Sequence, residues 1–292
     1  MVLTCSIVHP SLHFIGGAER LMVDLAVGLA DEGCVVEVVA GLCHKYWLDY
    51  IQQNGERVKV KVLGYKVPGN LLFWLNVRGF VKALARLISS ECDAVITSSF
   101  PASLVGDVFR MRNKALILHY LHEAPMVLHD REGVMALSSE LRLFYRFVSC
   151  FYRKFDLEAV CRSSRIIANS CFTRRVNAAV YGVAESGISV IYPGVDVMRL
   201  RGCVHELRFI GKYRRAGVPI IFFPRGVQSW RNSQVCVQAL SRLRVGEFVG
   251  VFTGGSRYEA AALFKYARRI GVDQKLLWLG ELADSDLFSL YS

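Results

Sequence analysis

The stretch from Val2 to Ala40 reads VLTCSIVHPSLHFIGGAERLMVDLAVGLADEGCVVEVVA. It begins with an apolar run at residues 2–8 and ends with a second one at 35–40, and runs of this length are typical of buried strands. Between them, residues 18–30 carry apolar side chains at helical spacing on one face, and Gly33 gives a plausible helix end. A strand, a helix and a second strand in this order predict parallel pairing, because crossover helices join parallel strands.

The same alternation continues along the rest of the chain. Further strand-like runs occupy residues 94–97, 115–119, 165–168 and 188–192, and a second series follows at 219–223, 247–253 and 276–279. Alternating strands and helices favour a mostly parallel, doubly wound sheet. We therefore predict the α/β class with two Rossmann-like domains, residues 1–200 and 201–292. The second is expected to be incomplete, because it shows three strands and a helical pattern that is cut short after Asp284.

The composition favours a folded chain with an anionic partner. Of the 292 residues 53% are hydrophobic, and the formal net charge is +11. Nucleoside diphosphates, nucleic acid and anionic lipids all carry the complementary charge. Nucleic acid is not expected as a partner, because the basic residues form no recognised nucleic-acid-binding module.

The sequence predicts a cytoplasmic location. Its nine cysteines are an odd number without a C-x-x-C pair, which favours reduced thiols. No basic segment precedes the first strand as in a signal peptide, and no uncharged apolar run reaches the length of a membrane span.

Residues 71–88 mix aromatic and basic side chains, which predicts peripheral contact with the cytosolic face of a membrane. The alternative is a surface helix packed on its own domain.

Two glycine pairs follow predicted strands. Gly16 and Gly17 join the first strand to the first helix, and Gly254 and Gly255 follow the strand at 247–253. Glycines allow the backbone N–H groups to approach a phosphate closely, and a tight turn without a ligand is the alternative at both places. The absence of G-x-G-x-x-G and the position of Glu37 inside the second strand disfavour a nicotinamide-dependent dehydrogenase.

Three side chains are candidates for direct contact with a ligand. His122 follows the strand at 115–119, at the end where open α/β sheets bind ligands. Arg225 and Arg231 lie across one loop after the strand at 219–223, and guanidinium groups donate paired hydrogen bonds to phosphate. A structural histidine and solvated surface arginines are the alternatives.

No metal or cofactor is expected. Asp284 and Asp286 have the D-x-D spacing of a metal site in another glycosyltransferase fold. They stand where a helix should begin, however, and aspartates are favoured there by capping and by the helix dipole. No histidine or cysteine cluster has zinc-binding spacing.

In chain order, these motifs resemble those of the family 4 glycosyltransferases of the GT-B fold. They are Gly16-Gly17-Ala18-Glu19, His122-Glu123-Ala124-Pro125, Asn169-Ser170-Cys171-Phe172-Thr173, Tyr192-Pro193-Gly194-Val195-Asp196, Arg225 with Arg231-Asn232, Gly254-Gly255 and Leu277-Trp278-Leu279-Gly280. Within the family the likeness is nearest to the α-1,3/1,6-mannosyltransferases of lipid-linked oligosaccharide synthesis. It is carried by His9-Pro10, the glycine loop and the basic hydrophobic region near residue 75.

The resemblance implies a retaining transferase that moves a hexosyl group, mannose from GDP-mannose, to a lipid-linked or other glycan acceptor. Gly16 and Gly17 would contact the donor phosphates or the acceptor, His122 the transferred sugar, and Arg225 the diphosphate. Arg231 stands where the family commonly has lysine, which would change the geometry around the donor.

The family's paired glutamates, seven residues apart, would follow Ser292 and are absent from this sequence. The sequence therefore leaves open a non-catalytic remnant that binds nucleotide sugars or a partner. A sugar-nucleotide epimerase of the same fold is a lesser alternative.

Overall fold

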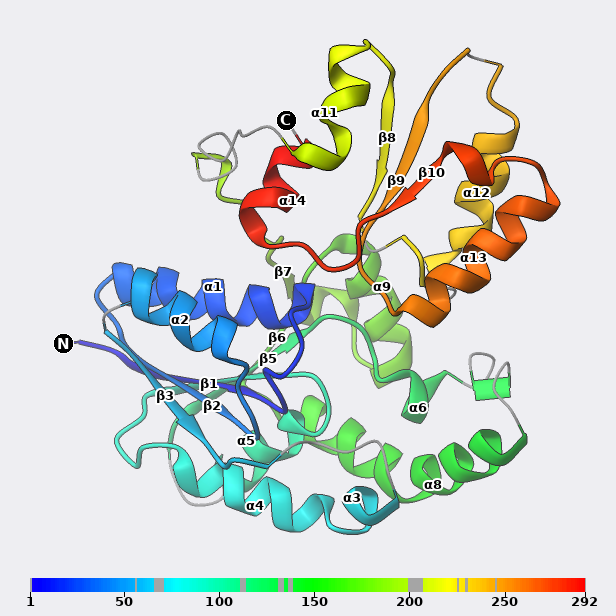
Figure 1. Cartoon of the computed structure of the whole chain (residues 1–292). Helices are drawn as coiled ribbons and strands as arrows, with labels where there is room; N and C mark the ends of the chain where they lie inside the picture. Colours follow the sequence, from blue (N-terminus) through cyan, green and yellow to red (C-terminus); the bar gives the residue numbers. More distant parts are fainter. Residues whose placement is uncertain are drawn as a thin grey trace. The chain divides into compact units, whose positions relative to one another are not determined.

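The computed structural model describes residues 2–55, 57–65, 71–110, 114–130, 134–135, 139–198, 207–224, 226–228, 231–244 and 246–291. The chain divides into two compact units, Met1–Gly194 and Val195–Ser292. The sequence placed its domain boundary at residue 200, within a few residues of this division. Each unit is described by itself below, and Figure 1 labels its elements.

The first unit is a doubly wound α/β domain. Its elements are β1 (Thr4–His9), α1 (Gly17–Asp31), β2 (Val35–Ala40), α2 (Lys45–Asn54), β3 (Val58–Val62), α3 (Leu71–Leu75), α4 (Val77–Leu87), β4 (Ala94–Ser98), α5 (Ala102–Arg110), β5 (Leu116–Leu121), α6 (Met126–His129), α8 (Ser139–Cys161), β6 (Arg165–Ala168), α9 (Cys171–Tyr181), η1 (Glu185–Gly187) and β7 (Ile188–Val190). The sheet order is β3-β2-β1-β4-β5-β6-β7, and every neighbouring pair is parallel. The predicted α/β class is confirmed.

The second unit repeats the pattern on a smaller scale. It contains α11 (Arg208–Arg215), β8 (Ile220–Phe223), α12 (Ser233–Ser241), β9 (Val249–Phe252), α13 (Arg257–Arg269), η3 (Asp273–Lys275), β10 (Leu276–Trp278) and α14 (Asp284–Tyr291). Its described strands pair in parallel in the order β10-β9-β8. Asp284 and Asp286 lie in the first turn of α14, where the helix dipole favours negative charge.

Both faces of the first sheet are covered by apolar packing. Successive strand residues point to opposite faces, so Ile7 joins the cluster beneath α1 and α2 while Val8 joins the cluster beneath α4 and α5. Figure 1 shows these two helix pairs on opposite sides of the sheet. The central strands are therefore buried on both sides, which explains their continuous apolar runs.

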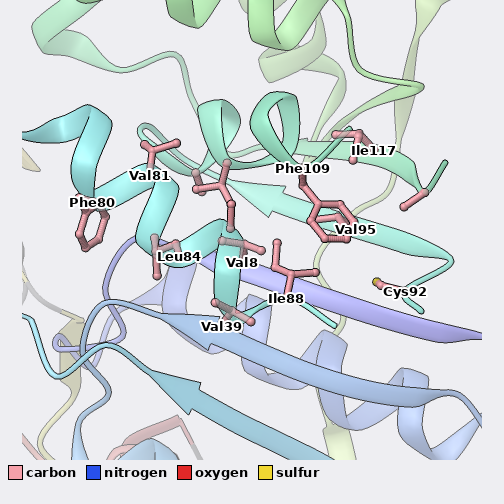
Figure 2. Close-up of a cluster of buried hydrophobic side chains, with 14 of the residues drawn as sticks. Val8, Val39, Phe80, Val81, Leu84, Ile88, Cys92, Val95, Phe109 and Ile117 are labelled. Carbon is pink, nitrogen blue, oxygen red and sulfur yellow. The ribbon is translucent and has the colours of Figure 1, made fainter. Parts of the chain in front are cut away.

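Several apolar side chains of residues 71–88 pack in the protein core. Phe73, Phe80 and Leu84 are buried in the cluster under α4, and Figure 2 shows Leu84 between Phe80 and Val8 in this view. These side chains are thus unavailable for contact with a membrane. The basic residues of the segment remain exposed; they are Arg78, Lys82 and Arg86.

No helix among the described residues is long and apolar enough to cross a bilayer.

The close packing of α5 on the sheet gives a stability prediction. A Cβ at Gly106 would lie 2.8 Å from Cγ2 of Ile117 and 3.2 Å from Cγ2 of Thr97, and both are stiff, β-branched side chains. Gly106→Ala should therefore lower the free energy of unfolding by about 1–3 kcal/mol through overpacking.

Gly28→Ala is the matched control, because a Cβ at this position in α1 meets open space. It should raise the free energy of unfolding by about 0.5–1 kcal/mol, as expected for alanine in a helix. Urea unfolding measures both values, and a Gly106→Ala protein as stable as the parent would contradict the close packing.

Candidate functional site

The carboxyl ends of the central strands form one edge of the first sheet. His9 ends β1, Ser98 ends β4, and His122 directly follows β5. Because β4 lies between β1 and β5, these three residues come from neighbouring strand ends. β2 and β3 extend the sheet on one side of β1, and β4 to β7 extend it on the other side. The strand order therefore reverses between β1 and β4, and open α/β sheets bind ligands at such a switch point.

His122 is held at this edge by a polar contact. Its Nε2 lies 2.9 Å from Oγ of Ser98, and its ring centroid lies 5.4 Å from that of Tyr120. Burial lowers the pKa of His122 to about 4, because a buried imidazole loses the hydration of its charged form. The ring is therefore neutral at physiological pH. It can exchange hydrogen bonds with a sugar hydroxyl but carries no positive charge.

Two further histidines lie under the same edge. Burial, with a smaller contribution from His122, lowers the pKa of His9 to about 3. Burial also lowers the pKa of His119 to about 4, and the Nδ1 of His119 lies 2.5 Å from Oγ1 of Thr97. The backbone N–H of Ser11 donates to Nδ1 of His9 over 3.3 Å, which leaves the ring proton on Nε2.

The segment after His122 is anchored by one buried carboxylate. Asp156 of α8 accepts hydrogen bonds from Oγ of Ser103 at 2.7 Å and from Oη of Tyr181 at 3.0 Å. Its Oδ2 also lies 2.9 Å from Nε2 of His129, at the end of α6. Asp156 thus ties α6, which follows His122, to α5, α8 and α9.

The two glycines before α1 differ in their surroundings. Gly16 is the N-cap residue, and its backbone is extended. A Cβ there would overlap the carboxylate of Glu19, whereas a Cβ on Gly17 would meet open space. Glycine at position 16 therefore makes room for Glu19, and the N–H groups near Gly17 are the better candidates for an anion.

The predicted donor residues of the second unit lie after its strands. Gly254 and Gly255 both have positive φ, 71° and 72°, so this turn requires glycine. The N–H of Gly254 donates to the carbonyl of Gly280 over 2.6 Å, and the indole of Trp278 donates to the carbonyl of Gly254 over 2.9 Å. These contacts support the turn interpretation of the pair.

Arg231 is exposed, and its Nε donates to Oε1 of Gln228 over 3.2 Å. Arg225 lies outside the described residues. Its predicted role, like those of Arg231, Gly254 and Gly255, stays a prediction.

Sequence reasoning proposed His122 but not its neighbours as site residues, and the role of His122 stays a prediction. Ser98 and Thr97 end an apolar run, and polar side chains at that position are the signal that could have found them. His119 lies inside a strand and gives no such signal. Within the described part of the chain, no group of three or more histidine, cysteine or acidic residues could hold a metal ion.

This fold is the one shared by glycosyltransferases of the GT-B class. The structure matches HepE from Anabaena, solved in complex with UDP-glucose, with a TM-score of 0.69, 18% identity and coverage of 99% of this chain and 71% of that one. It matches a glycosyltransferase from Rickettsia africae with a TM-score of 0.66, 21% identity and coverage of 99% and 70%.

Residues 15–199 match the model of glycosyltransferase family 4, and the chain belongs to that family. Its curated relatives include the α-1,3/1,6-mannosyltransferase alg2 of Schizosaccharomyces pombe, 29% identical over 65% of this chain and 36% of that protein. The Saccharomyces cerevisiae ALG2 protein is 26% identical over 66% and 38%. The chain thus spans less than half of these relatives.

The buried histidines give a pH prediction. His122 has a pKa of about 4 in the folded chain, below the value of about 6.5 expected when it is unfolded. Between these values the unfolded chain binds the extra proton, so stability is present above about pH 6.5 and falls on acidification. His9 and His119 act in the same direction.

The test compares the parent with His122→Asn, which keeps hydrogen-bonding atoms but does not titrate. Urea unfolding between about pH 7 and pH 5 should give a shallower loss of stability for the variant, by up to about 1.4 kcal/mol per pH unit. If the two curves of stability against pH ran parallel, His122 would have the same pKa in the folded and the unfolded chain, contrary to the prediction.

Proposed function

We propose that this chain is part of an enzyme that transfers mannose from GDP-mannose to a lipid-linked or other glycan acceptor, with retention at the anomeric carbon. The observation that carries the proposal is the family 4 match over residues 15–199. The curated relatives are named α-1,3/1,6-mannosyltransferases, which supports the choice of mannose. Donor, acceptor and stereochemistry all belong to this proposal.

The proposed reaction separates charge at the donor. The bond between the anomeric carbon and the diphosphate oxygen breaks with its electron pair going to that oxygen. The acceptor hydroxyl bonds to the same carbon, and its proton passes to the departing diphosphate oxygen. Arg225 and Arg231 would stabilise the departing diphosphate, because fixed donors aimed at developing charge lower the barrier.

His122 has a positioning and hydrogen-bonding role in this proposal. A neutral imidazole beside Ser98 can hydrogen bond a hydroxyl of the transferred sugar. Such a contact contributes to the rate only if it is stronger in the transition state than in the bound substrate.

A lipid-linked acceptor would place the protein at a membrane surface on the cytoplasmic side. The sequence prediction assigned this contact to residues 71–88, whose basic side chains are exposed while their aromatic side chains are buried.

The direct test is incubation of the chain with a panel of nucleotide sugars and lipid-linked acceptors, followed by identification of the product. Transfer from GDP-mannose with retained anomeric configuration is the expected result. Binding of a nucleotide sugar without transfer to any acceptor would contradict the enzyme proposal for this chain and support a binding role.

His122→Ala should lower turnover by roughly 100-fold or more, within the range found for positioned catalytic groups. GDP affinity should stay near the parent value, because His122 is proposed to meet the sugar. Turnover, calorimetric affinity and melting temperature are measured on one preparation. A variant that melts much earlier but keeps its turnover when folded would exclude the catalytic role.

Arg225→Ala should weaken the binding of GDP by about 1.5–3 kcal/mol, the usual loss for a hydrogen bond to a charged group. Arg242→Ala is the control, because Arg242 is exposed at the opposite, carboxyl end of α12. Calorimetry should show parent affinity for Arg242→Ala. Equal affinities for both folded variants would remove Arg225 from the donor site.

A further inference from the structure

An apolar stripe runs along the exposed side of α8. It consists of Leu143, Phe147, Phe151 and Phe155, which are 72%, 48%, 55% and 39% exposed. The four residues recur every fourth position, so they follow one side of the helix. The rings of Phe147 and Phe151 lie 4.7 Å apart between centroids. A contiguous apolar surface of this kind marks an interaction site.

Basic side chains flank this stripe. Between Leu143 and Phe155 the sequence contains Arg146, Arg153 and Lys154 and no acidic residue. The Nζ of Lys154 lies 3.9 Å from Glu158, while its side chain is 82% exposed. On the other side, the guanidinium of Arg78 in α4 lies 4.9 Å above the ring of Phe155.

The stripe is continuous with the surface that carries the basic residues of α4. Tyr152 of α8 donates a hydrogen bond to the carbonyl of Trp74, and the two rings lie 5.9 Å apart. Arg78, Lys82 and Arg86 follow one another at four-residue spacing and are exposed. α8 thus presents exposed aromatic side chains, and α4 adds exposed cations beside them.

A cavity of about 680 Å³ opens beside α8. Its lining includes the apolar side chains of Leu128, Val134 and Leu157 together with Arg146, Arg153 and Lys154, and it also includes Asp130. Apolar walls with several cations suit a molecule that joins a phosphate to a hydrocarbon chain.

We propose that the α8 stripe docks on an anionic phospholipid bilayer, with its phenylalanines in the interfacial region and Arg78, Arg146 and Lys154 on the lipid phosphates. Aromatic and leucine side chains beside lysine and arginine are the composition that binds such interfaces. The neighbouring cations favour anionic lipid over a second copy of this basic chain, because a second copy would bring like charges together. Docking needs neither a donor nor His122, so it can succeed or fail independently of the proposed reaction.

The experiment is flotation of the chain with vesicles of phosphatidylcholine and phosphatidylserine. The variant Phe147→Gln with Phe151→Gln should reduce the bound fraction about tenfold or more, since two interfacial apolar side chains are lost. Both residues are exposed, so the melting temperature should not change. Phe172→Gln on α9 is the matched control, because Phe172 is 69% exposed but lies outside the stripe, and it should float like the parent.

A second variant tests the charges. Arg146→Gln with Lys154→Gln should reduce binding to the mixed vesicles by roughly tenfold or more, and the parent should bind vesicles of phosphatidylcholine alone more weakly.

Equal flotation of the double phenylalanine variant and the parent would overturn the proposal, as would a parent that floats with neither vesicle. A parent dimer that the phenylalanine variant dissociates would assign the stripe to a second copy and also overturn it. GDP binding, measured without vesicles, reports separately on the proposed function.

Discussion

The parallel pairing of β1 with β2 on one side and β4 on the other is the constraint on which the first unit depends. A crossover between parallel strands is right-handed, so building the sheet outward in both directions places helices on both faces. The same reversal leaves neighbouring strand ends without a crossover between them. His9 and Ser98 lie at these ends, on β1 and β4, and His122 follows the next strand, β5.

Burial determines the charge of the histidines at this edge of the sheet. Three imidazoles with lowered pKa values lie at or beneath it, so the histidines act there as neutral hydrogen-bonding groups. An unpaired positive charge would be costly in this environment. A neutral imidazole can donate and accept hydrogen bonds but brings no positive charge to a ligand. Asp156 keeps the chain after His122 in place through its buried hydrogen bonds.

The sequence predicted those elements whose signal lies within a single segment. β1 and β2 were predicted because a strand buried on both faces has a continuous apolar run. α1 was predicted from the helical spacing of its apolar side chains. β3 (Val58–Val62) was missed, because its valines alternate with lysines at the sheet edge. His122 was identified by its position after a strand, but its contact with Ser98 joins two strand ends separated by 24 residues. Such a pair becomes visible only when the strand order is known.

The two aromatic helices of the first unit show why amphipathic character alone does not identify a docking surface. α4 has one apolar side, and the sheet covers it. α8 has two apolar sides: Val148 and Ala159 are buried, while Phe147 and Phe151 are exposed. The inner side of α8 already packs in the protein core. The outer phenylalanines therefore add nothing to the core, and their exposed apolar surface is unfavourably hydrated. A second apolar side on a helix that is already packed is therefore the stronger sign of an external partner.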